Sequence, residues 1–220
     1  MDLVIGNQNY SSWSLRPWLL LSHFDIPFEE VKIFLHEENT HQQLAEYSPT
    51  FKVPVLNDYH EGREITLWDS LAICEYISET YLSGKGLPSN SFERAVCRSY
   101  CAEMHSSFFA LRNALPMNCR ATRKVHLSVE TQKDINRIDG MWQDALNRHD
   151  GKWLFGNFSI ADCMFAPIAS RFATYQIAIS DTSQAYADNI LTLPSMLRWY
   201  DAALQEKEVI GEDEAGTDID

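Results

Sequence analysis

The hydrophobic pattern of this chain changes once, at residues 83–91, which open with Ser-Gly-Lys-Gly-Leu-Pro-Ser-Asn and carry little apolar weight. Such a stretch is typical of a linker between domains. Before it, short apolar runs alternate with helical spacings, and after it the spacing is helical almost throughout. A chain of 220 residues is long enough for two small domains. We therefore predict an α/β domain over residues 1–82, an all-helical domain over 92–205 and an acidic tail over 206–220.

The first domain is expected to follow the element order βαβαββα. Its opening is a short apolar run, a helix-spaced segment and an alternating segment, which together have the size of one β-α-β unit. A Val-Pro-Val-Leu run and a second apolar run separated by a polar turn then predict a hairpin. The expected strands lie at 3–6, 28–35, 53–56 and 64–67, and the expected helices at 15–21, 41–47 and 67–81.

The second domain is expected to contain four helices. Pro116 ends the first of them, because proline is not tolerated inside a helix. The Ser-Ile-Ala-Asp segment that begins at Ser159 has the form of a capping box. The expected helices cover 92–115, 128–146, a segment beginning at 159, and 194–203.

The charge of the chain is uneven. Asp and Glu total 31 against 18 Lys and Arg, a formal net charge of −13. Seven of the acids follow residue 205, against one base, Lys207, so about half of the net charge lies in the last 15 residues. An acidic chain is a poor partner for nucleic acid or for an anionic membrane surface. We read the acidic end as a solvated tail.

Five cysteines without a tight spacing disfavour a secreted disulfide scaffold. The N-terminal residues lack the basic region of a signal peptide, and no apolar run has the length of a membrane span. We therefore expect a cytoplasmic protein. Cys97, Cys101 and His105 share one helix face, but a straight helix places the first and third about 12 Å apart, too far to bind one ion. No metal site is expected.

Four short motifs are spread over most of the chain: Tyr-Ser-Ser-Trp-Ser-Leu-Arg at 10–16, Ser-Pro-Thr-Phe-Lys-Val-Pro-Val-Leu at 48–56, Leu-Trp-Asp-Ser-Leu-Ala-Ile at 67–73 and Gly-Asn-Phe-Ser-Ile-Ala-Asp at 156–162. Their order resembles that of cytosolic glutathione S-transferases, which carry Ser-Ser-Cys-Ser-Trp-Arg, Asn-Pro-x-x-x-Val-Pro-x-Leu, Glu-Ser-x-Ala-Ile and Ser-x-Ala-Asp. The resemblance is to serine-type members, nearest to zeta- and theta-like bacterial ones. It implies a thioredoxin-like N-terminal domain, an all-α C-terminal domain and glutathione transferase activity on a small apolar electrophile.

Two adjacent serines are the catalytic candidates. Glutathione reacts as its thiolate, and a hydroxyl donor at a helix N-terminus can lower the thiol pKa from its usual value of about 8.5. Ser11 and Ser12 lie just before an expected helix. A four-residue gap to Arg16 selects Ser12, whereas comparison with the zeta class selects Ser11. The alternative role for either serine is to cap that helix.

The resemblance assigns five residues to glutathione binding. Asp69 and Ser70 begin a helix, where N–H groups and a hydroxyl would take the γ-glutamyl carboxylate and Asp69 its amino group. Their alternative role is helix capping. Val53 would precede a cis Pro54 and pair its backbone with the cysteinyl residue. Lys52 would reach the glycyl carboxylate, or else is a solvated surface lysine.

A second-substrate pocket would be lined by side chains from two segments. We assign Tyr10 and Trp13 from the first motif, and Met104, His105 and Phe108 from the long helix, where core packing is the alternative. Trp13 stands where the zeta motif has cysteine. Because no cysteine lies near this loop and no CxxC is present, thiol–disulfide exchange is not expected.

Two alternatives to transferase activity stay open. The first is a glutathione-dependent isomerase of the maleylacetoacetate isomerase type, and the second is a non-catalytic glutathione-binding or assembly module. The expected partners are glutathione as co-substrate, a small hydrophobic electrophile and a second copy of the chain, since the family forms homodimers.

Overall fold

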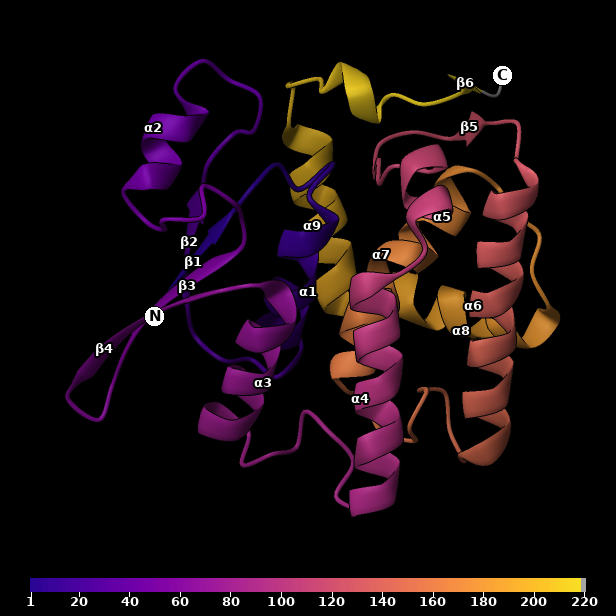
Figure 1. Ribbon diagram of the computed structural model, residues 1–220, viewed down its shortest axis with the longest axis horizontal. Helices are drawn as coiled ribbons and strands as arrows, with labels where there is room; N and C mark the ends of the chain where they lie inside the picture. The colour runs from indigo at the N-terminus through magenta and orange to yellow at the C-terminus, as the bar shows by residue number, and fades with distance from the viewer. Residues whose placement is uncertain (219–220) are drawn as a thin grey trace.

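The computed structural model describes residues 1–218 and has two parts that lie side by side (Figure 1). The first is built on one sheet of strand order β2–β1–β3–β4, in which β1 and β2 are parallel and the other pairs antiparallel. Its elements follow the predicted order βαβαββα. They are β1 (Asp2–Ile5), α1 (Ser12–His23), β2 (Glu29–Lys32), α2 (Thr40–Ala45), β3 (Val55–His60), β4 (Arg63–Trp68) and α3 (Ser70–Tyr81).

The second part is helical, apart from one ladder of two-residue strands and a single 3₁₀ turn, η1 (Gly211–Asp213). The fold class predicted from the sequence, a thioredoxin-like unit followed by a helical one, is therefore confirmed. Its elements are α4 (Ser91–Ser106), α5 (Phe109–Ala114), β5 (Arg123–Lys124), α6 (Val129–Arg148), α7 (Ile160–Thr174), α8 (Asp181–Leu191), α9 (Pro194–Gln205) and β6 (Thr217–Asp218).

Helix α1 joins the two parts into one core. It packs against α3 on one side and against α7 and α9 on the other, and Figure 1 shows it in the middle of the molecule. Leu15, Leu19 and Leu20 are fully buried, and Trp18 meets Trp199 of α9 edge to face at 5.1 Å between ring centroids. A helix that is apolar on nearly every side belongs in a core. As a result, the N-terminal end of α1 opens at the junction of the two parts.

The long helix expected over 92–115 is broken, which corrects that prediction. Ser107 is extended and Phe108 is left-handed, with φ 63° and ψ 40°, so α4 ends and α5 begins in a new direction. The break brings Arg112 of α5 under the end of α4, where its guanidinium donates to the carbonyls of Met104 and His105. Neither Gly nor Pro marks this break, so the local sequence carries no signal of it. The sequence also did not predict α8.

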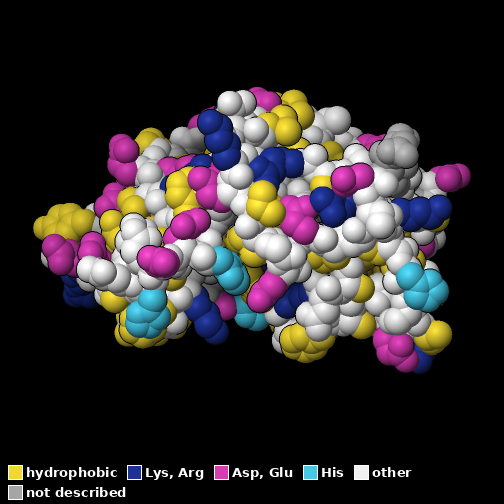
Figure 2. Space-filling model, turned by 90° about the horizontal axis from the view of Figure 1, so that it is seen from above, with side chains coloured by type: hydrophobic (Ala, Val, Ile, Leu, Met, Phe, Trp, Pro, Cys, Tyr) yellow, Lys and Arg dark blue, Asp and Glu magenta, His cyan; other side chains and the backbone are white. Residues whose placement is uncertain are grey.

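The acidic end of the chain is not a solvated tail over its described length. From α9 it crosses the top of the molecule in Figure 1 and reaches β5, against which β6 pairs. Glu206 and Ile210 are 7% and 4% exposed, and Glu214 forms an ion pair with Arg123 at 2.5 Å. Seen from above, this face intersperses acidic and basic side chains (Figure 2). The prediction of a solvated tail is wrong because the charge of a segment does not show which basic side chains, such as Arg123, the fold brings next to it. Residues 219–220 lie outside the described residues.

Within residues 1–218, no helix is long and apolar enough to cross a membrane, and no group of three or more His, Cys, Asp or Glu side chains is placed to hold a metal ion. All five cysteines are free and buried.

Candidate active site

Two neighbouring cavities lie beside the N-terminal end of α1, the first within the first part and the second at its junction with the helical part. The first, of about 540 Å³, is bounded by the segments around Val53 and Ser70, and the second, of about 470 Å³, extends from Ser12 toward Arg171 and Ile210. A larger hollow of about 850 Å³ lies elsewhere, around the loop that follows α3, and none of the predicted site residues lines it. Trp13, Lys52 and Val53 line both of the neighbouring cavities.

Ser11 acts as the helix cap. Its Oγ accepts from the Ser14 N–H at 3.4 Å, and its hydroxyl donates to the Ser14 Oγ at 2.8 Å. The Ser14 Oγ also accepts from the Gly6 N–H at 3.1 Å, which ties the helix start to the end of β1. The hydroxyl proton of Ser11 is therefore used in the bond to Ser14. Of the two serines, Ser11 is the one that caps the helix.

Ser12 is the first residue of α1 and lines the second cavity. Its Oγ accepts from Nη2 of Arg171 at 3.2 Å, and no acceptor among residues 1–218 takes its hydroxyl proton. The side chain is held in place by a cation while its proton stays available for a ligand. Of the two serines, the structure leaves only Ser12 with a hydroxyl free to donate.

The N-terminus of α3 opens into the first cavity. Asp69 caps it, because Oδ1 accepts from the Leu71 N–H at 2.9 Å and the Ala72 N–H at 3.3 Å. The Ser70 Oγ accepts from Nη1 of the buried Arg16 at 3.1 Å, so the hydroxyl proton points away from that arginine. The capping alternative for Asp69 is therefore observed. It is compatible with anion binding at the same helix end, where the Ser70 N–H has no acceptor within residues 1–218 and the helix dipole has its positive end.

His105 connects α4 to this helix end. Its Nε2 lies 3.0 Å from Oδ2 of Asp69, and its ring meets Trp13 edge to face at 5.3 Å. Burial lowers the pKa of His105, and Asp69 opposes part of that shift. The imidazole Nε2 thus contacts the Asp69 carboxylate, and the two side chains connect α4 to the start of α3. His105 lies behind the first cavity rather than along the second.

The Val53–Pro54 peptide bond is cis, as the resemblance implied. Val53 lies before β3 and lines both cavities. Within residues 1–218, no protein group bonds its backbone N–H or C=O. Those two groups can pair with an extended peptide as an added strand would. Lys52 and Pro54 line the first cavity beside it.

The residues assigned to the second-substrate pocket divide into two groups. Tyr10 and Trp13 line the second cavity, although the Tyr10 hydroxyl is occupied: it donates to Glu214 at 2.5 Å. Met104 is fully buried and Phe108 nearly so, and neither lines either cavity. Neither side chain is placed as assigned: Met104 precedes the break and lies on the buried face of α4 with Cys97 and Cys101, whereas Phe108 is buried at the left-handed break itself. Phe109, one position later, lines the second cavity instead.

Three arginines form a cationic cluster around Trp13 that sequence reasoning missed. Arg16 and Arg112 stack on the indole at 4.2 and 5.0 Å from the ring centroid, and Arg171 binds Ser12. Burial, followed by repulsion from other members of the cluster, lowers the pKa of Arg16 to about 9 and that of Arg171 to about 10. None of the three forms an ion pair with a carboxylate within residues 1–218. Their charge is therefore available to an anionic ligand, and the one signal in the sequence was an arginine inside the apolar run of α7.

The fold and these cavities define a class of protein in which a thioredoxin-like unit carries one cavity and forms an adjoining cavity together with a helical unit. The model of the family described as "Glutathione S-transferase, N-terminal domain" matches residues 10–80. A maleylacetoacetate isomerase of Dictyostelium discoideum is 28% identical over 199 residues, 85% of this chain and 88% of its own. A probable maleylacetoacetate isomerase of Vibrio cholerae is 26% identical over 206 residues, 89% of this chain and 94% of its own.

Solved structures agree in fold. A glutathione transferase homolog from Burkholderia, with bound glutathione, superposes with a TM-score of 0.69 over 94% of this chain and 98% of that chain, at 22% identity. A beta-class glutathione S-transferase of Sphingomonas chungbukensis gives a TM-score of 0.63 at 21% identity, over 92% and 98% of the two chains. The family model over residues 10–80, these relatives and the shared fold together support a member of the glutathione S-transferase family that is related to its zeta-like members.

Proposed function

We propose that this protein is a glutathione transferase in which Ser12 activates the glutathione thiol for attack on a small electrophile in the second cavity. One observation carries the proposal: at a helix N-terminus, in the wall of the second cavity, stands a hydroxyl whose oxygen accepts a hydrogen bond from Arg171 and whose proton has no acceptor within residues 1–218. Bound glutathione would supply the nucleophile.

The first cavity suits each part of the tripeptide. The N-terminus of α3 and the Ser70 hydroxyl would take the γ-glutamyl carboxylate, and Asp69 would face its amino group. The Val53 backbone would pair with the cysteinyl residue, directing its sulfur toward Ser12. Lys52 would reach the glycyl carboxylate. These roles fit the exposed N–H groups and the unpaired Val53 peptide described above.

Ser12 would act by donating its proton in a hydrogen bond to the thiolate. A hydrogen bond to a charged group contributes about 1.5–3 kcal/mol, which corresponds to a pKa lowering of about 1–2 units from about 8.5. Arg171 strengthens the donor, because a hydroxyl that accepts from a cation is polarised toward giving up its own proton. The dipole of α1 acts in the same direction. The thiolate then displaces a leaving group, such as chloride, from the electrophile, and the thiol proton passes to solvent.

The cationic cluster favours a second candidate function. Arg112 and Arg171 line the second cavity with charges that no carboxylate hydrogen-bonds, and a cavity of this kind suits a substrate that carries carboxylates. The relatives named maleylacetoacetate isomerases match most of this chain. In such a reaction the thiolate would add to a cis double bond and leave again after rotation. Trp13, where the zeta motif has cysteine, is the residue that sets this chain apart.

Three measurements test the proposal and separate the alternatives. The first is retention on immobilised glutathione, the second is turnover of 1-chloro-2,4-dinitrobenzene with glutathione, and the third is glutathione-dependent isomerisation of maleylacetoacetate. We expect retention and turnover of the dinitrobenzene. Isomerisation without conjugation would favour the second candidate, and retention without either activity would favour a binding module. Absence of binding at millimolar glutathione would refute all three.

We also propose that the protein is a cytoplasmic homodimer. Large apolar side chains stand exposed on one stretch of the first part and at the start of α4: Tyr59 at 67%, Ile65 at 36% and Phe92 at 81%. Exposed aromatic side chains such as Tyr59 and Phe92 are of the type enriched at protein–protein contacts. Sedimentation at the monomer mass would contradict the dimer, and fractionation with a membrane or secreted pool would contradict the compartment.

A further inference from the structure

The loop over residues 7–12 carries both serines and begins with a tight turn. The Ser11 N–H donates to the Asn7 carbonyl at 2.8 Å, and the Ser12 N–H donates to the Tyr10 carbonyl at 2.9 Å. This turn directs the backbone N–H groups of Gln8 and Asn9 away from the loop. Because both residues are buried, these donors need partners elsewhere in the protein.

Both donors bind one carboxylate from the far end of the chain. Oε1 of Glu206 accepts from the Gln8 N–H at 2.7 Å, and Oε2 accepts from the Asn9 N–H at 3.0 Å. Lys32 lies 3.1 Å from the same carboxylate and balances its charge. Glu206 follows directly after α9, so the end of that helix is tied to the loop 198 positions earlier. Two short, charge-assisted bonds to adjacent peptides fix the orientation of both.

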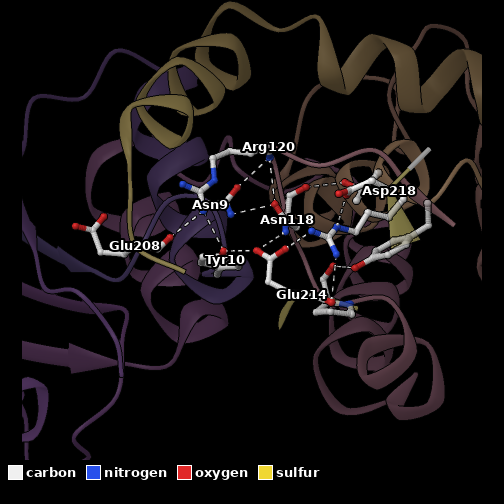
Figure 3. Close-up of polar contacts among 11 residues, drawn as sticks. Asn9, Tyr10, Asn118, Arg120, Glu208, Glu214 and Asp218 are labelled. Atoms are coloured by element: carbon white, nitrogen blue, oxygen red, sulfur yellow. Dashed lines mark hydrogen bonds and ion pairs between the residues drawn. The ribbon is translucent and has the colours of Figure 1, made fainter. Parts of the chain in front are cut away.

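A second connection holds the next residues of the loop. Figure 3 shows Asn9 and Tyr10 facing Asn118 and Glu214. The Asn9 amide donates to the Asn118 Oδ1 at 3.0 Å, and the Tyr10 hydroxyl donates to Glu214 at 2.5 Å. Arg120 donates to the Tyr10 hydroxyl at 3.0 Å and to backbone carbonyls after α9. Every residue from Gln8 to Tyr10 is therefore held by the segment 206–218, which we call the strap, or by residues that bind the strap.

We propose that the strap is a positioning element of the active site, in which Glu206 and Glu214 hold the loop 7–12 so that the Ser12 hydroxyl stands in the wall of the second cavity. The proposal rests on the function proposed above. Glu206 is a positioning residue and not a catalytic one, because it touches the loop backbone and lines neither cavity.

Replacement of Glu206 by glutamine tests this directly. In Glu206→Gln one carboxylate oxygen becomes an NH₂ group that faces a backbone N–H, so a buried donor loses its acceptor and the loop shifts. Glu208→Gln is the matched control, since Glu208 lies on the same strap and its side chain bonds only the neighbouring Lys207 N–H within the described residues. The measurements are the thiol pKa of bound glutathione, followed by thiolate absorbance, the kinetic constants with 1-chloro-2,4-dinitrobenzene, and the affinity for S-methylglutathione.

We expect Glu206→Gln to raise the thiol pKa of bound glutathione by about one unit and to lower kcat at neutral pH about tenfold. The affinity for S-methylglutathione, which has no thiol, should stay within about twofold, because other elements build the first cavity. Glu208→Gln should match the wild type in all three. Tyr10→Phe removes the Glu214 connection and keeps the backbone intact, so it should shift the thiol pKa in the same direction if Glu206→Gln does not fold.

An unchanged thiol pKa in Glu206→Gln would overturn the proposal, and so would an equal loss in Glu208→Gln. If Glu206→Gln is unfolded, an unchanged thiol pKa in Tyr10→Phe overturns it. These outcomes differ from failure of the proposed function, in which wild-type protein either binds no S-methylglutathione or leaves the glutathione thiol at its solution pKa. A purely structural role would lower the melting temperature and leave the thiol pKa of the folded fraction unchanged.

Discussion

Removing the hydroxyls of Ser11 and Ser12 one at a time should separate thiol activation from helix capping. Ser12→Ala deletes the hydroxyl whose proton is free and leaves Nη2 of Arg171 without that acceptor. Ser11→Ala deletes the cap acceptor for the Ser14 N–H and a donor to the Ser14 Oγ. Each variant loses one or two hydrogen bonds of typical strength, so its free energy of unfolding should be about 1 kcal/mol below that of the wild type. The two variants thus form a pair matched in stability.

The chemistry of this pair should differ. A charge-assisted bond of about 1.5–3 kcal/mol corresponds to about 1–2 pKa units, so Ser12→Ala should raise the thiol pKa of bound glutathione by that amount. At neutral pH, kcat/KM for 1-chloro-2,4-dinitrobenzene should fall about 10- to 100-fold. Ser11→Ala should leave both quantities near the wild-type values.

Two measurements decide the outcome. Ultraviolet titration of the thiolate in the complex with glutathione gives the thiol pKa, and urea unfolding gives the stability of each variant. If Ser11→Ala raises the thiol pKa and Ser12→Ala does not, Ser11 is the activating residue, as the zeta comparison suggested. If neither variant raises it, the serine mechanism is wrong and the helix dipole or the arginines must activate the thiol.

Three further predictions concern single side chains. Burial raises the pKa of Asp162 from 3.8 to about 6, so the stability that the protonated carboxyl contributes is complete at low pH and is lost as pH rises through about 6. In urea unfolding at several pH values, Asp162→Asn should lack this loss, which amounts to about 3 kcal/mol. An equal dependence of the unfolding free energy on pH in both proteins would contradict the prediction. Asp213 lines the second cavity, so its charge should disfavour anionic substrates. Asp213→Asn should raise about fivefold the ratio of kcat/KM for anionic 4-chloro-3,5-dinitrobenzoate to kcat/KM for 1-chloro-2,4-dinitrobenzene, whereas the control Glu212→Gln should leave this ratio unchanged. Equal ratios in both variants would show that Asp213 does not set the charge of the cavity. His105→Phe removes the contact between Nε2 and the Asp69 carboxylate, so it should weaken S-methylglutathione binding in calorimetry about fivefold. Unchanged affinity would exclude a positioning role for His105.

Much of the first part could be predicted because its signals are local. The alternating residues around Val31 and the Val-Pro run at the start of β3 indicate strands without reference to the rest of the chain. The Asp-Ser pair at the start of α3 indicates a helix N-terminus in the same way. The same locality placed Ser11 and Ser12 together at the start of α1. The choice between them was not local, because it depends on a partner in α7.

The roles of distant residues required the tertiary structure. Arg171 lies 159 positions from the serine it binds, and nothing in either segment announces the other. Phe108 was misassigned for a related reason: it is the left-handed residue of a break that neither Gly nor Pro marks, and its side chain is buried. Met104 lies before the break, on the face of α4 that packs into the core. Side-chain direction after such a break depends on packing with other helices rather than on spacing along one helix.

The sequence by itself determined the element order of the first part, the family resemblance and the candidates for glutathione binding, since each depends on patterns a few residues long. Only the tertiary structure decided what the acidic end does. Net charge counts Glu206 and Glu214 as two acids among many, whereas the fold gives the first two backbone donors and Lys32, and the second a tyrosine and Arg123. Buried polar groups must find partners wherever the fold places them, and those partners lie about 200 residues apart along the chain.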